Sequence, residues 1–508
     1  MLSDGHRLHA LEVRNVSFTC TLDDESTCAR FFSPPQVVRT LKDVSFEAIS
    51  GEVHALVGTA GSGRNLLLNV VSGSANGDTA GSVQLDNYVL SRERFTKLCS
   101  LASSRQRSSR IFTVHSLLYH AAALTFGDSL PLKTLDRRLH TLMREFDLLG
   151  YGHERLEHLS VSAQRRTLIA KALVKDPVLL LVEDPCEGLE AIACYQLLYC
   201  LKNYAAEHNR IVLISMANPR SDLCQMISSL TMLFRGEVVY SGKIQDMAGY
   251  IRDAGLSCPE KENPAMYYLS KATVNFETQE TYEKTLSEAE RLTSYSSGTL
   301  PRFCNLTSSG GGTVPLCFLR RPTTATKLLV LVKLAFLAVS SKRRFLLLRI
   351  STLPALMFLL SSFSTNLISG SWISPYVSYR IFEVALLVVH CASTTLALIN
   401  YGELLPLSVA ESFDDLYGKA LLCTAYVFAV VGVDAISSLM SAAILLWMSN
   451  VTGPAVILQM SVVFLCVFLN AHFVTMTLML HIRDSLACSC LSLFTLILWL
   501  LFGGGMLR

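Results

Sequence analysis

Apolar residues are distributed unevenly along the chain. Before about residue 325 they alternate with polar and glycine-containing stretches, as in an ordinary soluble domain. Beyond that point long apolar stretches dominate. The pattern predicts a soluble domain over 1–270, a linker over 271–325 and a membrane domain over 326–508.

Crossing a bilayer as a helix takes about 20 mostly apolar residues. The candidate spans are 346–366, 381–400, 419–448, 454–480 and 486–506. Since only helices satisfy their own backbone polar groups in lipid, we expect an all-α domain of about five helices. Basic residues gather on one side of these spans: Lys342, Arg343, Arg344, Arg349, Lys419 and Arg483. This bias predicts an integral protein of the plasma membrane or an intracellular membrane, with its N-terminal domain in the cytosol.

Three ionisable residues, Glu383, His390 and Asp434, lie within or beside these spans. Such groups are costly in lipid and usually face the interior of the helix bundle. They indicate either a substrate path or subunit interface, or hydrogen bonds that hold helices together. The pattern alone leaves both interpretations open and favours the second.

The join between the two halves is rich in Ser, Thr and Glu, with SSGGGT at 308–313, which predicts a flexible linker. The apolar segment 323–345 that follows ends in basic residues. It predicts either a helix at the inner membrane surface or a short buried helix with a solvated basic end.

Composition changes the picture only in what it excludes. The 508 residues are 51% hydrophobic and 17% charged, with a net charge of +3, which is too small to indicate nucleic-acid binding. No apolar secretory segment opens the chain, so we expect the thiols of the first domain to stay reduced. The 15 cysteines show no zinc-site spacing.

Residues 58–65 read GTAGSGRN, between an apolar strand, HALVG, and an apolar helix, LLLNVVSG. Strand, glycine loop and helix form the setting of a phosphate-binding P-loop, whose pattern is G-x-x-x-x-G-K-[ST]. The candidate nucleotide-binding residues are Gly58, Thr59, Ala60, Gly61, Ser62, Gly63, Arg64 and Asn65. Backbone N–H groups of the loop would hold phosphates at the helix N-terminus.

Two residues depart from the P-loop pattern. Arg64 keeps the positive charge of the usual lysine but has a longer, planar head. Asn65 replaces the hydroxyl that binds Mg²⁺ with an amide oxygen, a poorer ligand. Farther along, 178–190 read VLLLVEDPCEGLE, a buried strand that delivers Glu183 and Asp184 to its C-terminal end. Ligands bind at that end of parallel α/β sheets.

These segments, in this order, resemble the ATPase domain of an ABC transporter, and an ATPase domain before a membrane domain resembles the G subfamily of half-transporters. Within it the chain resembles the sterolins, through NPRSDLCQM at 218–226, FRGEVVYSG at 234–242 and GLSCPEKENPAMYYLS at 255–270. The resemblance implies an α/β P-loop domain followed by an all-α membrane domain. GGGMLR at the end resembles a turn late in the family's fifth span, which implies a shortened C-terminus.

The family's motifs match incompletely. In the signature segment LSVSAQRR, Ser160 is retained but Val161 and Ser162 replace the two glycines. Glu183 stands where the family has its Mg²⁺-associated aspartate, and Asp184 where it has its catalytic glutamate, so the two acids are reversed. Asp184 would misplace the attacking water by about an ångström, and such a displacement can cost roughly 10²-fold in rate.

Three further family positions have also changed. The switch histidine aligns with Ala217 and the D-loop aspartate with Glu190. The Q-loop glutamine aligns with Ser104, unless the loop shifts by two residues and brings in Gln106.

The resemblance therefore implies a lipid- or sterol-exporting half-transporter that binds ATP and Mg²⁺ weakly and hydrolyses ATP poorly. Asn65 and Glu183 would be its Mg²⁺ ligands. A heterodimer with a second G-type half-transporter is favoured, because a homodimer would carry the same defects at both sites. The alternatives are a non-catalytic regulatory membrane subunit and a truncated product that transports nothing.

Overall fold

The structure is a computed structural model. It describes residues 9–22, 36–103, 112–255, 258–259, 262–271, 273, 279–298, 322–340, 343–368, 374–449, 453–482 and 484–502. Contacts divide the chain into two units, and each is described by itself. The first comprises 1–108, 113–122 and 129–320, and the second 109–112, 123–128 and 321–508.

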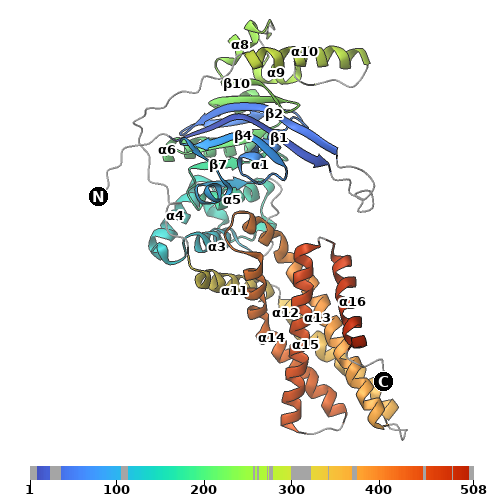
Figure 1. The fold of residues 1–508 in the computed structure, drawn as a ribbon. Helices are drawn as coiled ribbons and strands as arrows, with labels where there is room; N and C mark the ends of the chain where they lie inside the picture. Colours follow the sequence, from blue (N-terminus) through green and yellow to red (C-terminus); the bar gives the residue numbers. More distant parts are fainter. Residues whose placement is uncertain are drawn as a thin grey trace. The chain divides into compact units, whose positions relative to one another are not determined.

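A six-stranded sheet forms the core of the first unit (Figure 1). Its strands, in the order β10-β9-β3-β8-β7-β6, are Glu237–Lys243, Ser229–Phe234, Val53–Val57, Ile211–Met216, Leu179–Val182 and Cys99–Ala102. All neighbours pair in parallel except β10, which is antiparallel to β9. Every residue of β3, β7 and β8 is buried, as expected for central strands covered on both faces.

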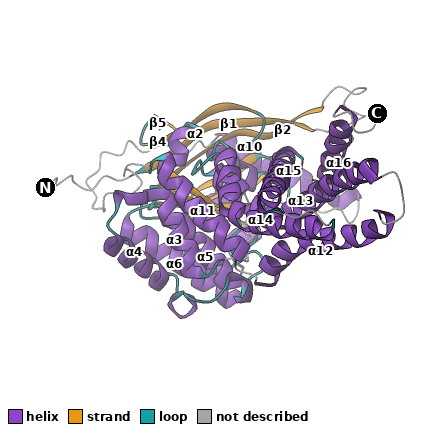
Figure 2. Ribbon diagram, turned by 90° about the horizontal axis from the view of Figure 1, so that it is seen from below, coloured by secondary structure: helices purple, strands orange, loops and turns teal. Residues whose placement is uncertain are grey.

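Helices connect the parallel strands. The helices between β3 and β9 are α1 (Arg64–Val71), α2 (Arg92–Leu98), α3 (Val114–Phe126), α4 (Leu132–Glu145), α5 (Val161–Leu173), α6 (Ala191–His208) and α7 (Ser221–Cys224), with 3₁₀ turns at Gly127–Ser129, Leu149–Tyr151 and Leu156–His158. Residues 123–128, at the end of α3 and the start of the turn after it, belong to the second unit. In Figures 1 and 2, α4, α5 and α6 lie on one side of β1, β2 and β4. The result is the predicted α/β arrangement.

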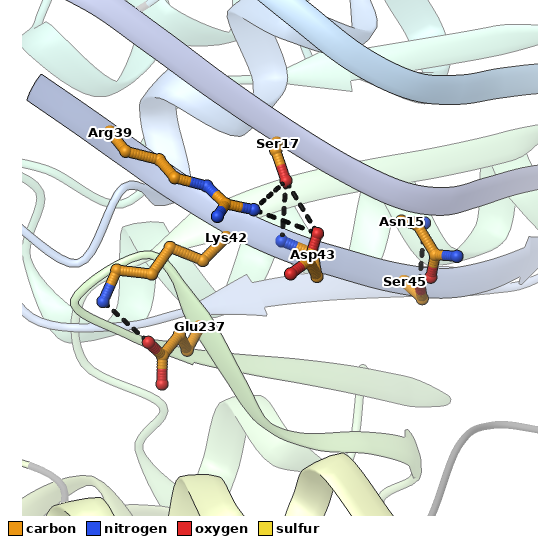
Figure 3. Close-up of polar contacts among 7 residues, drawn as sticks. All are labelled: Asn15, Ser17, Arg39, Lys42, Asp43, Ser45 and Glu237. Carbon is orange, nitrogen blue, oxygen red and sulfur yellow. Dashed lines mark hydrogen bonds and ion pairs between the residues drawn. The ribbon is translucent and has the colours of Figure 1, made fainter. Parts of the chain in front are cut away.

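A second, antiparallel sheet has the order β2-β1-β4-β5, formed by Gln36–Ile49, Ala10–Leu22, Asp78–Leu85 and Tyr88–Val89. The register of β1 and β2 shifts near Asn15 and Asp43, whose φ angles are +48° and +49°. Side chains secure these irregular positions (Figure 3). Ser17 Oγ donates to Asp43 Oδ1 at 2.9 Å, and Ser45 Oγ donates to Asn15 Oδ1 at 3.0 Å.

Helices α8 (Met247–Asp253), α9 (Pro264–Lys271) and α10 (Gln279–Gly298) follow β10. Within the predicted linker, 271–325, the structure places helix α10 at 279–298. The polar composition of this segment obscured the periodicity of an amphipathic helix. In that helix Ala289 and Leu292 are three residues apart, and both are buried. The glycine-rich part at 308–313 lies outside the described residues.

Two of the thiols that the sequence led us to expect reduced are joined in this structure. Cys186 and Cys194 form a disulfide, with their Cα atoms 5.1 Å apart. Their spacing matches no metal motif. The turn between β7 and α6 folds back on itself and brings the two residues together.

The second unit contains helices α11 (Thr324–Ser340), α12 (Arg343–Ile368), α13 (Ser374–Phe413), α14 (Lys419–Met448), α15 (Pro454–His481) and α16 (Ser485–Phe502). Four of them are long and apolar enough to cross a membrane, over Leu346–Phe363, Ile381–Ile399, Lys419–Met448 and Pro454–His481. These confirm four of the predicted spans. The apolar part of α16 among the described residues is the shorter Leu486–Leu498, so a fifth span stays a prediction.

A buried ion pair joins two of these helices. Arg349 of α12 donates from Nε to Asp434 Oδ1 of α14 at 2.8 Å and from Nη2 to Oδ2 at 3.0 Å, and both side chains are 1% exposed. Arg349 Nη1 also donates to the Tyr426 hydroxyl at 3.2 Å. The helix–helix interpretation of Asp434 is confirmed. Counting Arg349 among the basic residues that flank the spans was wrong, because its charge is paired inside the bundle.

Candidate nucleotide site

The glycine loop lies where the sequence predicts it, between β3, which ends at Val57, and α1, which begins at Arg64. Gly61 and Gly63 adopt φ angles of +82° and +93°, in the left-handed region that other residues rarely enter. The loop can therefore turn sharply into the helix. Successive backbone N–H groups in such a turn form a concavity suited to anions.

Residues far away in the sequence support the loop from behind. Ser62 O accepts a hydrogen bond from Gly236 N at 3.0 Å, and Gly236 O accepts one from Lys42 N at 2.8 Å. A Cβ added to Gly63 would lie 2.7 Å from Leu41 Cδ2. An ion pair of 2.7 Å between Lys42 Nζ and Glu237 Oε1 joins the same two segments (Figure 3). Strand β2 and the β9–β10 turn thus hold the loop in position.

Arg64 points back onto the loop and across to β7. Its Nη1 donates to the carbonyl oxygens of Gly58 at 2.7 Å and Thr59 at 3.2 Å. Its Nη2 donates to both carboxylate oxygens of Asp184 at 3.1 Å, and its Nε donates to Oδ1 at 3.4 Å. The side chains of Arg64 and Asp184 are only 13% and 10% exposed. We call this contact the Arg64–Asp184 clamp.

Asn65 completes the clamp and leaves an acceptor free. Its Nδ2 donates to Asp184 Oδ2 at 2.7 Å. Its Oδ1 and the Ser62 hydroxyl oxygen are buried atoms that find no hydrogen-bond partner in the described part of the chain. A buried amide oxygen without a donor suits a hard cation such as Mg²⁺. The residues present therefore fit a Mg²⁺–nucleotide, for which Asn65 Oδ1 would be a ligand.

The two acids at the end of β7 have separate partners. Glu183 accepts a short hydrogen bond from the Ser103 hydroxyl at the end of β6. Asp184 has a φ of +40°, and its backbone N–H donates to Ser215 Oγ of β8 at 2.9 Å. Three parallel strands thus fix both carboxylates at one sheet edge. Both carboxylate oxygens of Asp184 are engaged by the clamp.

Comparison with known proteins identifies this region. Residues 41–187 match the family described as "ABC transporter". They form an ABC transporter ATPase domain. The match runs from β2 through the glycine loop to the acids after β7, which are the segments that build the site.

Several curated proteins of the G subfamily are similar to this chain. Human "ATP-binding cassette sub-family G member 5" is 29% identical over 50% of this chain and 40% of its own length. Rat "ATP-binding cassette sub-family G member 8" is 28% identical over 50% and 37%, and Arabidopsis thaliana "ABC transporter G family member 8" is 27% identical over 46% and 39%. The resemblance to the G subfamily of half-transporters is confirmed. The chain spans 37–40% of the length of these three relatives.

Among the described residues, the other positions aligned with ABC motifs share no hydrogen bond with the clamp. Ser160 is the N-cap of α5, and its Oγ accepts from Ala163 N at 3.3 Å within that helix. Val161 follows it with 58% of its surface exposed. Ala217, which the resemblance aligns with the switch histidine, comes directly after β8. Both Q-loop candidates, Ser104 and Gln106, lie outside the described residues.

The sequence missed three partners of the site: Ser103, Ser215 and Gly236. Each comes from another strand or turn. Gly236 lies in the quoted segment 234–242, but that segment gave no sign of a contact with the glycine loop. It also assigned Arg64 to a phosphate and gave no sign of its pairing with Asp184. Strong apolar strands next to Ser103 and Ser215 were the one available signal, because their C-terminal ends must meet at the same sheet edge.

Proposed function

We propose that the chain is one half of an ATP-dependent ABC transporter that exports sterols or other lipids, paired with a second G-type half-transporter. Similarity to G-subfamily proteins supports this, together with an ATPase domain, proposed to span 1–270, ahead of the helices within 326–508. Sterols are proposed because the segments around NPRSD and GEVVYSG resemble those of the sterolins. The four apolar helices support a location in a membrane.

The Arg64–Asp184 clamp is the observation that carries the second part of the proposal, that this half is catalytically weak. Asp184 stands at the position of the family's catalytic glutamate, yet both of its oxygens accept hydrogen bonds from Arg64 and one accepts from Asn65. A carboxylate neutralised in this way is a poor acceptor for a proton from water. Phosphoryl transfer depends on positioning and charge stabilisation, so this one contact reduces turnover at the site.

Nucleotide binding needs less of the site than hydrolysis does. The backbone of the glycine loop and the open Asn65 Oδ1 remain available to a Mg²⁺–nucleotide. Bound Mg²⁺ would neutralise part of the phosphate charge at the start of α1. The Glu183 carboxylate lies at the same sheet edge and would contribute a further oxygen ligand. Arg64 must exchange the Asp184 carboxylate for phosphate, which weakens binding but permits it.

Pairing with a different half-transporter follows from the same defect. A homodimer would repeat the clamp and the substituted signature segment at both of its sites. A better-equipped partner would supply one site able to hydrolyse ATP. The proposed assembly is therefore a heterodimer with one weak site and one active site.

Purified heterodimers in lipid vesicles test the proposal. We expect ATP-dependent movement of a fluorescent sterol, photolabelling of this chain by an azido-ATP, and loss of transport when the partner's catalytic acid is replaced. Partner alone and chain alone are the controls. No sterol or phospholipid movement by the assembled pair would refute the transport proposal.

The second candidate function is that of a regulatory membrane subunit. The clamp favours it as well, because a site closed by its own side chains can act as a structural partner without turnover. In the same vesicles, this function predicts a changed ATPase rate of the partner with no lipid movement. Absence of stable association would exclude both functions.

A further inference from the structure

The disulfide lies beside the candidate nucleotide site. Cys186 follows Asp184 by two residues, in the loop between β7 and α6, and Cys194 lies in the first turn of α6. Cys194 is 3% exposed, whereas Cys186 is partly open to solvent. The bond therefore connects the segment that carries Asp184 directly to a packed helix.

Without this bond, the loop between the two cysteines is held by only a few polar contacts among the described residues. Glu187 N donates to Asp184 O at 3.2 Å, and Leu189 N donates to Cys186 O at 3.2 Å. Arg165 Nη2 donates to Glu187 O at 3.2 Å. Glu187 and Glu190 are exposed, and no residue from 186 to 190 is fully buried. Few buried apolar contacts and exposed backbone bonds are typical of segments that open easily.

We propose that Cys186 and Cys194 are a reversible thiol–disulfide pair that locks the 185–190 loop, and with it Asp184, in the clamped position. This proposal rests on the proposed function in one respect, namely that the loop lies beside the proposed nucleotide site. In a reducing cytosol the dithiol is the resting form, and an oxidising shift closes the bond.

The proposed exchange partner is a small-molecule thiol–disulfide couple, glutathione. In oxidation, one protein thiolate attacks glutathione disulfide and expels one glutathione thiolate. The second protein thiolate then attacks the protein sulfur of the mixed disulfide and expels the other. Two protein thiols become one disulfide, and two electrons pass to glutathione disulfide, which becomes two glutathione thiols. In reduction, a glutathione thiolate attacks the accessible Cys186 Sγ and expels the buried Cys194 thiolate. A second glutathione thiolate then attacks the glutathione sulfur of the mixed disulfide, which releases the Cys186 thiolate and forms glutathione disulfide.

Cys200 on the same helix is a matched control. It is partly buried and belongs to no disulfide. Burial raises the pKa of its thiol, which leaves less thiolate to react. Cys200→Ser should therefore behave as the unaltered chain, whereas Cys194→Ser should lose the lock.

The test uses the full chain in lipid nanodiscs equilibrated with oxidised and reduced glutathione at several ratios. Mass spectrometry of peptides detects the Cys186–Cys194 link, and hydrogen exchange follows the amides of 184–190. We expect the link to appear as the ratio becomes oxidising and loop exchange to slow about ten-fold or more. Cys200→Ser should repeat this result, and Cys194→Ser should show fast exchange at every ratio.

Two outcomes would overturn the lock: no linked peptide at any ratio, or equal loop exchange in the linked and reduced forms. Binding of a fluorescent ATP analogue, measured on the same samples, keeps the proposals apart. A chain that forms the link and slows its loop but never binds nucleotide would refute the ATP-binding part of the proposed function and support the lock.

Discussion

Replacing Asp184 by Asn should tighten nucleotide binding. The change keeps the size of the side chain and leaves the backbone bond from residue 184 to Ser215 Oγ in place. It removes the negative charge that Arg64 contacts at 3.1 Å. Phosphate must compete with that charge for the same guanidinium group, so its removal favours the nucleotide.

The magnitude follows from the geometry of the clamp. Two unit charges 3.1 Å apart attract by about 5 kcal/mol at an effective dielectric constant of about 20. Desolvation of both groups offsets much of this, and hydrogen bonds to charged groups contribute about 1.5–3 kcal/mol net. Since about 1.4 kcal/mol corresponds to ten-fold in affinity, the dissociation constant should fall about 10- to 100-fold. Loss of repulsion between Asp184 and phosphate acts in the same direction.

Fluorescence titration of the full chain with a labelled ATP analogue and Mg²⁺ measures the effect. Asp222→Asn is the matched control, because Asp222 also pairs with an arginine, Arg220, but at an exposed position. The control should leave the dissociation constant unchanged. Equal or weaker binding by Asp184→Asn would refute the competition argument and show that Asp184 instead prepares Arg64 for phosphate.

Three further predictions concern stability. Gly63→Ala should lower the free energy of unfolding of the first unit by about 1–3 kcal/mol, since residue 63 has a φ of +93° and the new Cβ would lie 2.7 Å from Leu41 Cδ2. Adding Leu41→Ala to the Gly63→Ala chain should restore part of the lost stability, as measured by thermal melting. If the effects of the two changes simply add, the steric explanation is contradicted. Asp434→Leu should cost about 3–5 kcal/mol by leaving Arg349 charged and buried, and the double change with Arg349→Met should recover most of the melting temperature. No recovery would show that the ion pair is not what holds α12 to α14. Burial lowers the pKa of His54 to about 3, so the unfolded chain binds a proton near pH 6.5 and the native chain does not. Stability contributed by neutral His54 is complete above that pH and falls by up to about 1.4 kcal/mol per pH unit towards pH 3. His54→Gln should show a shallower decline of melting temperature over this range, and parallel curves would contradict it.

Local patterns were enough to predict some elements of this protein. The run HALVG followed by glycines and an apolar helix is readable because each signal lies within a few neighbouring residues. Four spans were readable for the same reason, since a membrane helix needs only length and apolar composition. Helix α10 was missed because its two buried residues, Ala289 and Leu292, stand in a polar stretch where composition outweighed periodicity.

Contacts between distant residues were decided by the tertiary structure alone. Arg64 and Asp184 are 120 positions apart, and Arg349 and Asp434 are 85 apart. The sequence shows that each charge exists, and it explains why a charge in an apolar setting needs a partner. Which partner it finds depends on strand order and helix packing, which place side chains within about 3 Å of one another. The residue types thus determined that this chain has a glycine loop with an arginine and two acids, and the fold determined that the arginine lies on one of those acids.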